Sequence, residues 1–391
     1  MKKALLFVVL LTPFLLLNNC GTCNSQYTYQ PPEEINDEIQ VSSLTDVGMD
    51  SGIIAKGIKQ IFCGKFNEIH SMLIYKDNHL VVEEYFAGYK YQWDAPNYQG
   101  EFVQWDREML HPIMSCAKSY TSALIGIAIK KGFIKSVNQS IFDYLPDHQQ
   151  FKSGGKENIT IEHLLTMTSG LAWNEWGAAH GTSANDIDRI YFECSDDPIT
   201  CVLERELLYT PGEVFNYNGG GIIILGEIIN NASGLTVEEF AKTYLFKQLG
   251  INSSQWYQFN NGVYAIEGSL SLRPRDMLKF GILYLQNGIW QGKEVLSKEW
   301  INKSSNLYKN NNGIKIPIED SGKNGYGYTW WITTHKLKGE KINMYRANGW
   351  GGQTIMVFPD VKMVVVFTSG NFPRESKLFK LVNNYVLPAI N

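Results

Sequence analysis

The chain carries little net charge of either sign. Its 391 residues include 35 Lys and Arg and 39 Asp and Glu, which gives a formal charge of −4. Proteins that bind nucleic acid usually have a strong excess of Lys and Arg, because their partner is a polyanion. A nucleic-acid partner is therefore not expected. Because 44% of the residues are hydrophobic and only 19% are charged, the composition predicts a globular protein with a substantial core and excludes a disordered chain.

Cysteine is scarce as well, with six residues in the whole chain. That number is too small for a disulfide scaffold in a protein of this length, although it allows one or two bridges. The seven histidines contain no His-x-x-x-His pair of the kind that binds zinc. We expect no structural metal and no cofactor.

The longest apolar run begins close to the N-terminus. Residues 4–17 are almost entirely apolar, a length that is short for a membrane span but typical of an export signal. Cys20 follows soon after, and the arrangement resembles a bacterial lipoprotein signal, in which this thiol is lipidated. Residues 1–20 are therefore expected to be a lipoprotein signal, with an ordinary secretory signal or an uncleaved anchor as alternatives. Residues 21–45 are predicted to tether a folded unit to a membrane, on the periplasmic or cell-surface side.

Export would place the remaining cysteines in an oxidising compartment. Cys194 and Cys201 are seven residues apart and could close a small loop there. Cys63 and Cys116 are expected to be free cysteines that pack as small hydrophobic side chains.

The pattern of apolar residues predicts strands at both ends of the folded unit and helices between them. Residues 71–89 alternate between apolar and polar around a polar turn at residues 76–78, which is typical of a hairpin. Residues 115–131 form a long apolar run that Gly132 follows, which predicts a buried helix. Further strands are predicted near the C-terminus, at residues 326–332, 354–358 and 363–367.

This order predicts an α/β protein in which an antiparallel sheet is flanked by helices and interrupted by a mostly helical insertion. Residues 46–391 would form the folded unit. Within it, residues 46–134 and 266–391 would build the α/β part, and residues 135–265 would build the helical part.

Ser115 and Lys118 are the first candidates for chemistry. They stand three positions apart at the start of the predicted buried helix, so their side chains share one face of it. Burial would disfavour the ammonium form of Lys118, and a neutral amine could then accept the proton of Ser115. The same spacing recurs at Ser153 and Lys156, in a glycine-rich loop with no helix to fix its geometry. One such match is therefore a weak signal by itself.

Two further segments could complete a site. Tyr217 lies in a Pro-Gly-x-x-Phe-x-Tyr sequence before an apolar stretch, where its phenol would be presented on a loop or would merely pack at a junction. Residues 346–353 read Arg-Ala-Asn-Gly-Trp-Gly-Gly-Gln. Glycines let a backbone approach a ligand closely, and N–H groups on such an edge can hold an oxyanion. The alternative for this segment is a bulge or a tight corner.

These motifs occur in the order found in the serine β-lactamase-like hydrolases, and the chain resembles this family over most of its length after the tether. The family contains class C β-lactamases, DD-peptidases, related esterases and 6-aminohexanoate-dimer hydrolases. Residues 164–171, Leu-Leu-Thr-Met-Thr-Ser-Gly-Leu, match a frequent family signature. Residues 269–281 and 326–331 look most like the 6-aminohexanoate-dimer hydrolase branch.

The resemblance implies a β-lactamase/transpeptidase-like fold, with Ser115 as the acylated nucleophile, Lys118 as its base partner and Tyr217 as a second proton-transfer group. The chain departs from the family pattern in two places. Gly219 stands where an Asn often contacts the side chain of a β-lactam. The strand motif Lys-Thr-Gly or His-x-Gly, whose cation seats a carboxylate, is replaced by a glycine-rich segment without a cation. Both departures disfavour penicillin turnover and D-Ala-D-Ala peptidase activity.

The resemblance also places an oxyanion hole and a substrate-binding segment. The oxyanion hole would combine the Ser115 N–H with the N–H of either Trp350 or Gly352. The sequence leaves both of these alignments open. Asn348 and Gly351 belong to the same segment.

Glu175, in the sequence Trp-Asn-Glu-Trp, could line the cleft and meet an amine of a substrate. The alternative is a surface loop with one buried tryptophan. The triplet Ser183-Ala184-Asn185 superficially fits a class A β-lactamase motif, but its surroundings do not support that reading.

The sequence thus predicts an exported serine hydrolase that cleaves a carboxylic ester or a small linear amide. Its partners would be a small ester, amide or peptide-like molecule, and a membrane reached through the lipid anchor. The alternatives are β-lactamase or DD-peptidase activity, or a tethered sensor or binding protein of the same fold that has lost hydrolysis.

Overall fold

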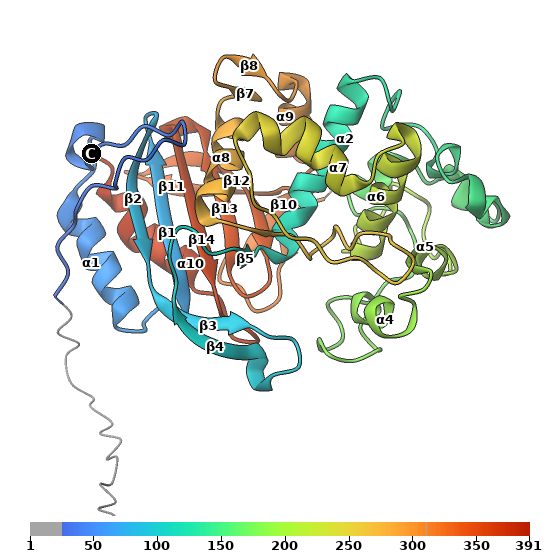
Figure 1. Ribbon diagram of the computed structural model, residues 1–391, viewed down its shortest axis with the longest axis horizontal. Coiled ribbons are helices and arrows are strands. Elements are labelled where there is room, and N and C mark those ends of the chain that lie inside the picture. Colours follow the sequence, from blue (N-terminus) through green and yellow to red (C-terminus); the bar gives the residue numbers. More distant parts are fainter. Residues whose placement is uncertain (1–25, 310) are drawn as a thin grey trace, which may run out of the picture.

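The computed structural model of the protein describes residues 26–309 and 311–391 (Figure 1). The predicted export signal, residues 1–20, and the lipidation site Cys20 lie outside the described residues. The centre of the molecule is a sheet of eight strands in the order β2-β1-β14-β13-β12-β11-β10-β9, in which all neighbours are antiparallel. The strands are β1 (Ile69–Lys76), β2 (His79–Tyr85), β9 (Ile314–Lys315), β10 (Lys323–Tyr326), β11 (Trp331–Leu337), β12 (Glu340–Gly349), β13 (Gln353–Phe358) and β14 (Met363–Ser369).

Strands from distant parts of the chain meet in this sheet, as the sequence predicted. β1 pairs with β14 in an antiparallel register that places Leu73 opposite Val366. The predicted hairpin is confirmed as β1 and β2, whose turn residues Asp77 and Asn78 have φ values of 47° and 68°. A tight hairpin turn requires such positive φ values.

Both faces of the sheet are covered, because alternate side chains of its central strands enter two separate cores. In β14, Val364 and Val366 belong to one core, whereas Val365 and Phe367 belong to the other. Side chains alternate between the faces of a strand, so an uninterrupted apolar run indicates a strand that is buried on both sides. The first core is covered by α2 (Ala117–Lys130) and α8 (Pro274–Leu285), and the second by α1 (Ser51–Phe62) and α10 (Leu378–Leu381) (Figure 1).

The buried helix predicted at residues 115–131 is present as α2, and a short 3-10 turn at Met114–Cys116 precedes it. Its residues from Ala117 to Ala128 are all buried. Gly132 follows the helix with a φ of 82°, a conformation that glycine adopts without strain.

A mostly helical region lies beyond α2, on the side away from the sheet (Figure 1). Its centre is α6, which packs against α2, α3 and α5. The predicted limits of this region, residues 135 and 265, stay a prediction. Its helices are α3 (Ile161–Leu165), α4 (Asp186–Glu193), α5 (Pro198–Leu203), α6 (Gly219–Ser233) and α7 (Val237–Ala241).

The remaining elements are short. They are α9 (Lys298–Ser305), β3 (Ala87–Tyr91), β4 (Gln99–Gln104), β5 (His111–Pro112), β6 (Ser271–Leu272), β7 (Ile289–Trp290) and β8 (Lys293–Glu294). No single helix in the described part of the chain is long and apolar enough to cross a membrane. The pair formed by α6 and residues Val237–Leu249, bent by 77°, meets the length and composition of a span only when taken together.

One strand prediction is wrong. Residues 326–332 were expected to form a single strand, but β10 ends at Tyr326 and β11 begins at Trp331. Between them Thr329 has a φ of 64°, and its N–H donates to the carbonyl of Leu165 at 3.0 Å. The aromatic residues of this segment therefore belong to a hairpin. The long strand β12 was not predicted.

The folded unit also begins before residue 46. Ile39 and Leu44, in the segment expected to be a tether, are 4% and 0% exposed. Val41 forms a parallel bridge with Leu80 of β2, and Arg275 of α8 forms an ion pair with Asp37 at 2.9 Å. These contacts hold the segment against the sheet.

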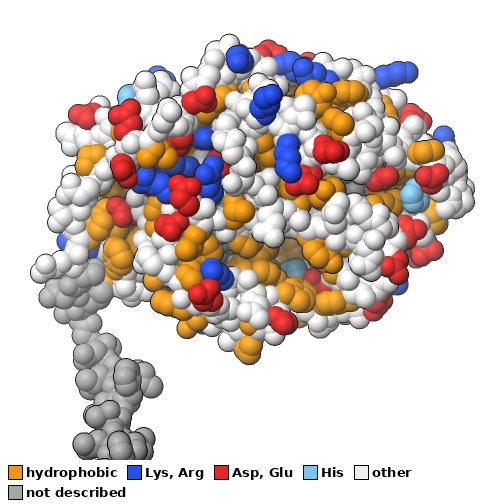
Figure 2. Space-filling model, viewed as in Figure 1, with side chains coloured by type: hydrophobic (Ala, Val, Ile, Leu, Met, Phe, Trp, Pro, Cys, Tyr) orange, Lys and Arg blue, Asp and Glu red, His pale blue; other side chains and the backbone are white. Residues whose placement is uncertain are grey.

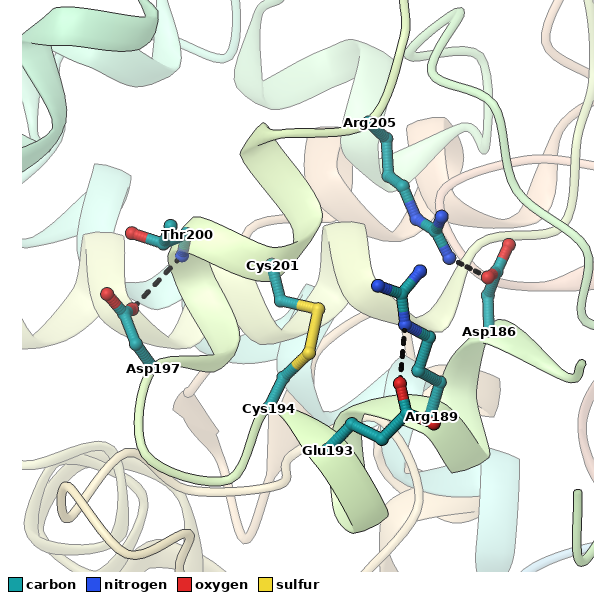
Figure 3. The surroundings of a disulfide bond; sticks show 8 residues. All are labelled: Asp186, Arg189, Glu193, Cys194, Asp197, Thr200, Cys201 and Arg205. Carbon is teal, nitrogen blue, oxygen red and sulfur yellow. Dashed lines mark hydrogen bonds and ion pairs between the residues drawn. A yellow bond between two sulfur atoms is a disulfide. The ribbon is translucent and has the colours of Figure 1, made fainter. Parts of the chain in front are cut away.

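The cysteine predictions are partly confirmed. Cys194 and Cys201 form a disulfide with a Cα–Cα distance of 6.1 Å, which links the end of α4 to α5 (Figure 3). Cys116 is free and buried as expected. Cys63 is disulfide-bonded, so the prediction that it is a free cysteine is wrong.

Candidate active site

A cleft of about 1040 Å³ brings the predicted site residues together. Its walls come from the start of α2, the loops beside α4 and α6, and the end of β12. The sequence-predicted residues that line it are Ser115, Lys118, Glu175, Tyr217, Asn348, Trp350, Gly351 and Gly352. Segments more than 200 residues apart in the sequence thus face one another across one cavity.

Ser115 and Lys118 are in contact. The Nζ of Lys118 lies 2.9 Å from the Oγ of Ser115, and it also donates to the carbonyl of Glu267 at 2.9 Å. Lys118 is 2% exposed, whereas Ser115 is half-buried and faces the cleft. The spacing of three residues along the start of a helix accounts for this contact.

The turn that presents Ser115 is tight. Met114, directly before it, has a φ of 49°, which is an unfavourable conformation for a residue with a side chain. The end of β12 presses against this turn, because a Cβ added to Gly349 would lie 2.5 Å from the carbonyl oxygen of Ile113. Only a glycine at this position allows β12 to approach the serine so closely.

Tyr217 is packed and also faces the serine and lysine. Its ring packs against those of Trp176 and Trp331, with centroid distances of 4.8 Å and 6.0 Å. The Nζ of Lys118 lies 5.0 Å from the centroid of the Tyr217 ring, and Lys118 and Ser115 are near enough to the phenol to lower its pKa. The sequence left open whether Tyr217 presents its phenol on a loop or packs at a junction. Both descriptions apply, because packing of the ring fixes the phenol in the cleft.

The charge on Lys118 differs from the expectation. Burial lowers the pKa of Lys118, and the charge that Tyr217 carries when ionised is the largest effect that raises it. The carboxylates of Glu175 and Glu267 add to this effect, and the net pKa of Lys118 lies above that of an ordinary lysine. This direction favours the ammonium form over the predicted neutral amine, because acidic groups that are distant in sequence surround Lys118, and the role of Lys118 as a base stays a prediction.

Tyr217 is protonated in the same state. Burial raises the pKa of the Tyr217 phenol, and the neighbouring Lys118 lowers it by less. The resting arrangement is thus a lysine ammonium beside a neutral phenol, with the ammonium donating to the oxygen of Ser115.

Glu175 is a buried residue in a loop whose neighbouring residues Asn174 and Trp176 are exposed. Its Oε2 accepts a hydrogen bond from the N–H of Gly219 at 2.7 Å and another from the indole of Trp173 at 2.8 Å. A carboxylate at the first N–H groups of α6 is favoured by the helix dipole. Glu175 therefore fixes the start of α6 directly after Tyr217, besides lining the cleft.

A profile of the Beta-lactamase family matches residues 70–382. The chain belongs to the Beta-lactamase family. This is a family of serine hydrolases whose members related to this chain include esterases, amidases and carboxypeptidases, so the family and the fold class recognised from the sequence are both confirmed.

Three individual proteins illustrate the similarity. Penicillin-binding protein 4* of Bacillus subtilis is 22% identical over 291 residues, which cover 66% of this chain and 60% of that protein. The structure of a candidate 6-aminohexanoate-dimer hydrolase from Bacillus anthracis has a TM-score of 0.66 and 22% identity, and the match covers 83% of this chain and 80% of that one. The structure of a family VIII carboxylesterase has a TM-score of 0.63 and 13% identity, and the match covers 91% of this chain and 99% of that one. At such identities the structures show a shared fold alone.

Glu267 is a residue of this Beta-lactamase-family site that sequence reasoning missed. It is 2% exposed and lines the cleft. Its Oε1 accepts a hydrogen bond from the hydroxyl of Tyr191 at 2.6 Å, whereas its Oε2 is buried without a hydrogen-bond partner among the described residues. Burial raises the pKa of Glu267 to about 7. The one signal in the sequence is an acidic residue in the otherwise uncharged stretch 263–272.

A cation also lines the cleft, although not on the strand where the family motif places one. Arg346 of β12 is fully buried, is paired with Glu319 and lies over the ring of Phe379, 4.5 Å from its centroid. Its charge is thus already neutralised. Arg374, on the exposed loop after β14, lines the cleft instead. The glycine-rich segment itself supplies no cation to the cleft, as expected, and Arg374 comes from a different element.

The second Ser-x-x-Lys sequence lies outside the cleft. Ser153 is exposed, and Lys156 donates to the carbonyl of Leu203 at 2.5 Å. Within the described residues, no group of three or more His, Cys, Asp or Glu side chains is arranged to hold a metal ion.

Proposed function

We propose that the protein is an exported serine hydrolase that cleaves a carboxylic ester or a small linear amide through an acyl-enzyme on Ser115. The observation that carries this proposal is the contact of 2.9 Å between the Nζ of Lys118 and the Oγ of Ser115, beside Tyr217 in one cleft. Membership of a serine hydrolase family supports the same chemistry.

The base would be the Lys118 and Tyr217 pair after the loss of one proton. When Lys118 is an ammonium and Tyr217 is a neutral phenol, neither group can accept the proton of Ser115. The fraction of protein that can react therefore grows as the pH rises. In that fraction the Oγ of Ser115 attacks the substrate carbonyl, and its proton passes to the pair. The tetrahedral intermediate collapses, and the departing alcohol or amine takes this proton. Water then attacks the acyl-enzyme with the same pair as its base, which releases the acid and restores Ser115.

The N–H groups of Ser115 and Trp350 would bind the oxyanion. Of the two registers left open by the sequence, Gly352 is disfavoured because its N–H already donates to the carbonyl of Gly349 at 3.2 Å. A donor that closes a turn is not available to a substrate without opening that turn. Trp350 stands directly after the end of β12, beside the turn that presents Ser115.

The assignment of Ser115 is tested by ester hydrolysis. Activity towards p-nitrophenyl esters is expected to fall to background in Ser115→Ala, because Ser115 carries the hydroxyl that contacts Lys118 in the cleft. Ser153→Ala is the matched control and should retain full activity. Hydrolysis that persists in Ser115→Ala, with a melting temperature equal to the parent's, would contradict the assignment.

A second candidate function is the cleavage of substrates that carry a carboxylate, such as β-lactams or D-Ala-D-Ala peptides. Arg374 favours it, because a guanidinium in the cleft can bind a carboxylate in a bidentate manner. Nitrocefin and a D-Ala-D-Ala peptide should then be turned over by the parent protein and much more slowly by Arg374→Ala. If neither is cleaved, the ester or amide assignment stands alone.

The membrane anchor is a separate part of the proposal and rests on residues 1–20 alone. Lipidation of Cys20 would place the cleft on the periplasmic or cell-surface side of a membrane. Replacing Cys20 by Ala should release the protein from the membrane fraction if the cysteine carries the anchor.

A further inference from the structure

A ribbon of two strands, separate from the central sheet, reaches over the cleft. It consists of β3 and β4, and residues 92–98 connect them. The ring of Trp93 in this connection lies 5.7 Å from that of Phe192 in α4, and the hydroxyl of Tyr98 donates to the carbonyl of His180 at 3.3 Å. The ribbon begins beside the sheet and extends away from it (Figure 1), and its contacts with Phe192 and His180 carry it across the cleft to the helical region.

Five aromatic residues line the cleft at this crossing, and we call them the aromatic roof. Each ring packs on a neighbour, with centroid distances of 5.8 Å from Trp93 to Tyr98 and 4.9 Å from Tyr98 to Trp350. The roof consists of Tyr91, Trp93, Tyr98, Phe192 and Trp350.

The roof presents apolar surface that the protein itself does not cover. Trp93 is 38% exposed and Phe192 is 49% exposed. A single exposed ring is common on protein surfaces, but these two rings contact each other and both line the cleft. Figure 2 shows hydrophobic side chains gathered around a hollow in the lower half of this face. Burial of such surface by a ligand is favourable, because each apolar area removed from water contributes to binding.

The roof is continuous with the reacting centre. Trp350 contributes its ring to the roof, and its backbone N–H is the oxyanion donor proposed above. A substrate whose carbonyl oxygen binds this N–H therefore has its scissile carbon beside the roof. At about 1040 Å³ the cleft is as large as a site for a drug-sized ligand and exceeds what a short linear amide fills.

We propose that the aromatic roof is a subsite for an aromatic group of the substrate, carried on the acyl side of the ester or amide. This proposal rests on the proposed function of Ser115. Charged residues border the subsite but leave its centre apolar. Asp188 is engaged by the imidazole of His180 at 3.2 Å and by the N–H of Gly181 at 2.8 Å, so it does not compete for an uncharged ring.

The test compares two ethyl esters, because ethanol keeps the leaving group constant and non-aromatic. Ethyl 3-phenylpropionate carries the aromatic acyl group, and ethyl acetate lacks it. The parent should hydrolyse the phenylpropionate with the higher kcat/KM. In Trp93→Ala and in Phe192→Ala this kcat/KM should fall by about tenfold, while that for ethyl acetate changes by less than about twofold.

Phe102→Ala is the matched control. Phe102 is 59% exposed on β4 of the same ribbon but does not line the cleft, so its loss should change neither kcat/KM. The proposal is overturned if the parent shows no preference for the phenylpropionate. It is also overturned if the roof variants slow both esters equally, or if Phe102→Ala has the same effect as they do.

A binding measurement separates this proposal from the proposed function. Ser115→Ala cannot be acylated, so equilibrium binding of 3-phenylpropionamide and of propionamide to this variant reports the subsite alone. The aromatic amide should bind at least about tenfold more tightly, and Trp93→Ala in the same background should abolish the difference. Equal binding of the two amides overturns the subsite even if Ser115 proves to be the nucleophile. A preference without any hydrolysis by the parent would leave the subsite standing and refute the proposed function.

Discussion

The contact between Ser115 and Lys118 could be predicted from the sequence, because it depends only on the geometry of a helix start. The charge on Lys118 could not. It depends on Glu267, which is 149 residues away in the chain, and on Glu175, whose burial follows from its contact with the first N–H of α6. A sequence pattern predicts contacts between residues that are a few positions apart on a helix. The pKa of a group depends on all the charges that the fold brings near it.

Glu267 should control the pH dependence of the reaction. Its negative charge stabilises the ammonium form of Lys118 and so raises the pKa of Lys118. Because the reaction needs the lysine and tyrosine pair with one proton removed, Glu267→Gln should move the rising limb of the kcat/KM profile to lower pH. Relative activity near pH 7 should rise by roughly threefold or more.

The effect should be specific to this carboxylate. Glu267 titrates with a pKa of about 7, so the two profiles should differ most above that pH, where its charge is present. Glu340→Gln, which removes an exposed carboxylate at the start of β12, is the control and should leave the profile in place. A shift of the Glu267→Gln limb to higher pH would show that Glu267 acts on the reaction in another way.

At the scale of elements, the approach of β12 to the start of α2 builds the site. The sequence located both segments and left open whether the glycines of residues 346–353 serve a ligand or a corner. The structure shows that Gly349 serves the packing of two backbones, since it faces the carbonyl of Ile113. No local pattern could show this, because the partner lies more than 200 residues away.

Gly349→Ala should therefore impair catalysis while the fold persists. The added Cβ would lie 2.5 Å from the carbonyl oxygen of Ile113, a distance that forces β12 and the serine turn apart. A displacement of this kind separates the nucleophile from the oxyanion donor, and kcat should fall by about 100-fold with little change in far-ultraviolet circular dichroism.

Asn343→Ala, an exposed position on the same strand, is the control for β12 and should keep the activity of the parent. Full activity in Gly349→Ala would mean that the two elements can separate without cost to the reaction.

At the scale of the whole molecule, the antiparallel sheet, the central helix α2 and the helical region beyond it could be predicted from apolar patterns. Apolar runs such as β14 are informative, because both sides of the strand are buried. β12 was missed because exposed polar residues, such as Lys341 and Asn343, interrupt its first half. The hairpin at residues 326–332 was misread because its aromatic residues resemble one strand, whereas Thr329 turns the chain with hydrogen bonds to Gly327 and to the distant Leu165.

The cleft has a local arrangement of charges that the formal charge of −4 does not reveal. The cleft contains the carboxylates of Glu175 and Glu267 beside one buried lysine, with Arg374 at its margin. Overall charge excluded a polyanionic partner but could not show that the reacting group is surrounded by acids.

The most direct test of the account is the covalent labelling of the whole protein by a fluorophosphonate, measured by intact-mass spectrometry and peptide mapping. We predict a single adduct on the peptide that contains Ser115, unchanged in Ser153→Ala and absent in Ser115→Ala. An adduct that persists in Ser115→Ala, or that maps to any other residue, would contradict the central claim that Ser115 is the nucleophile.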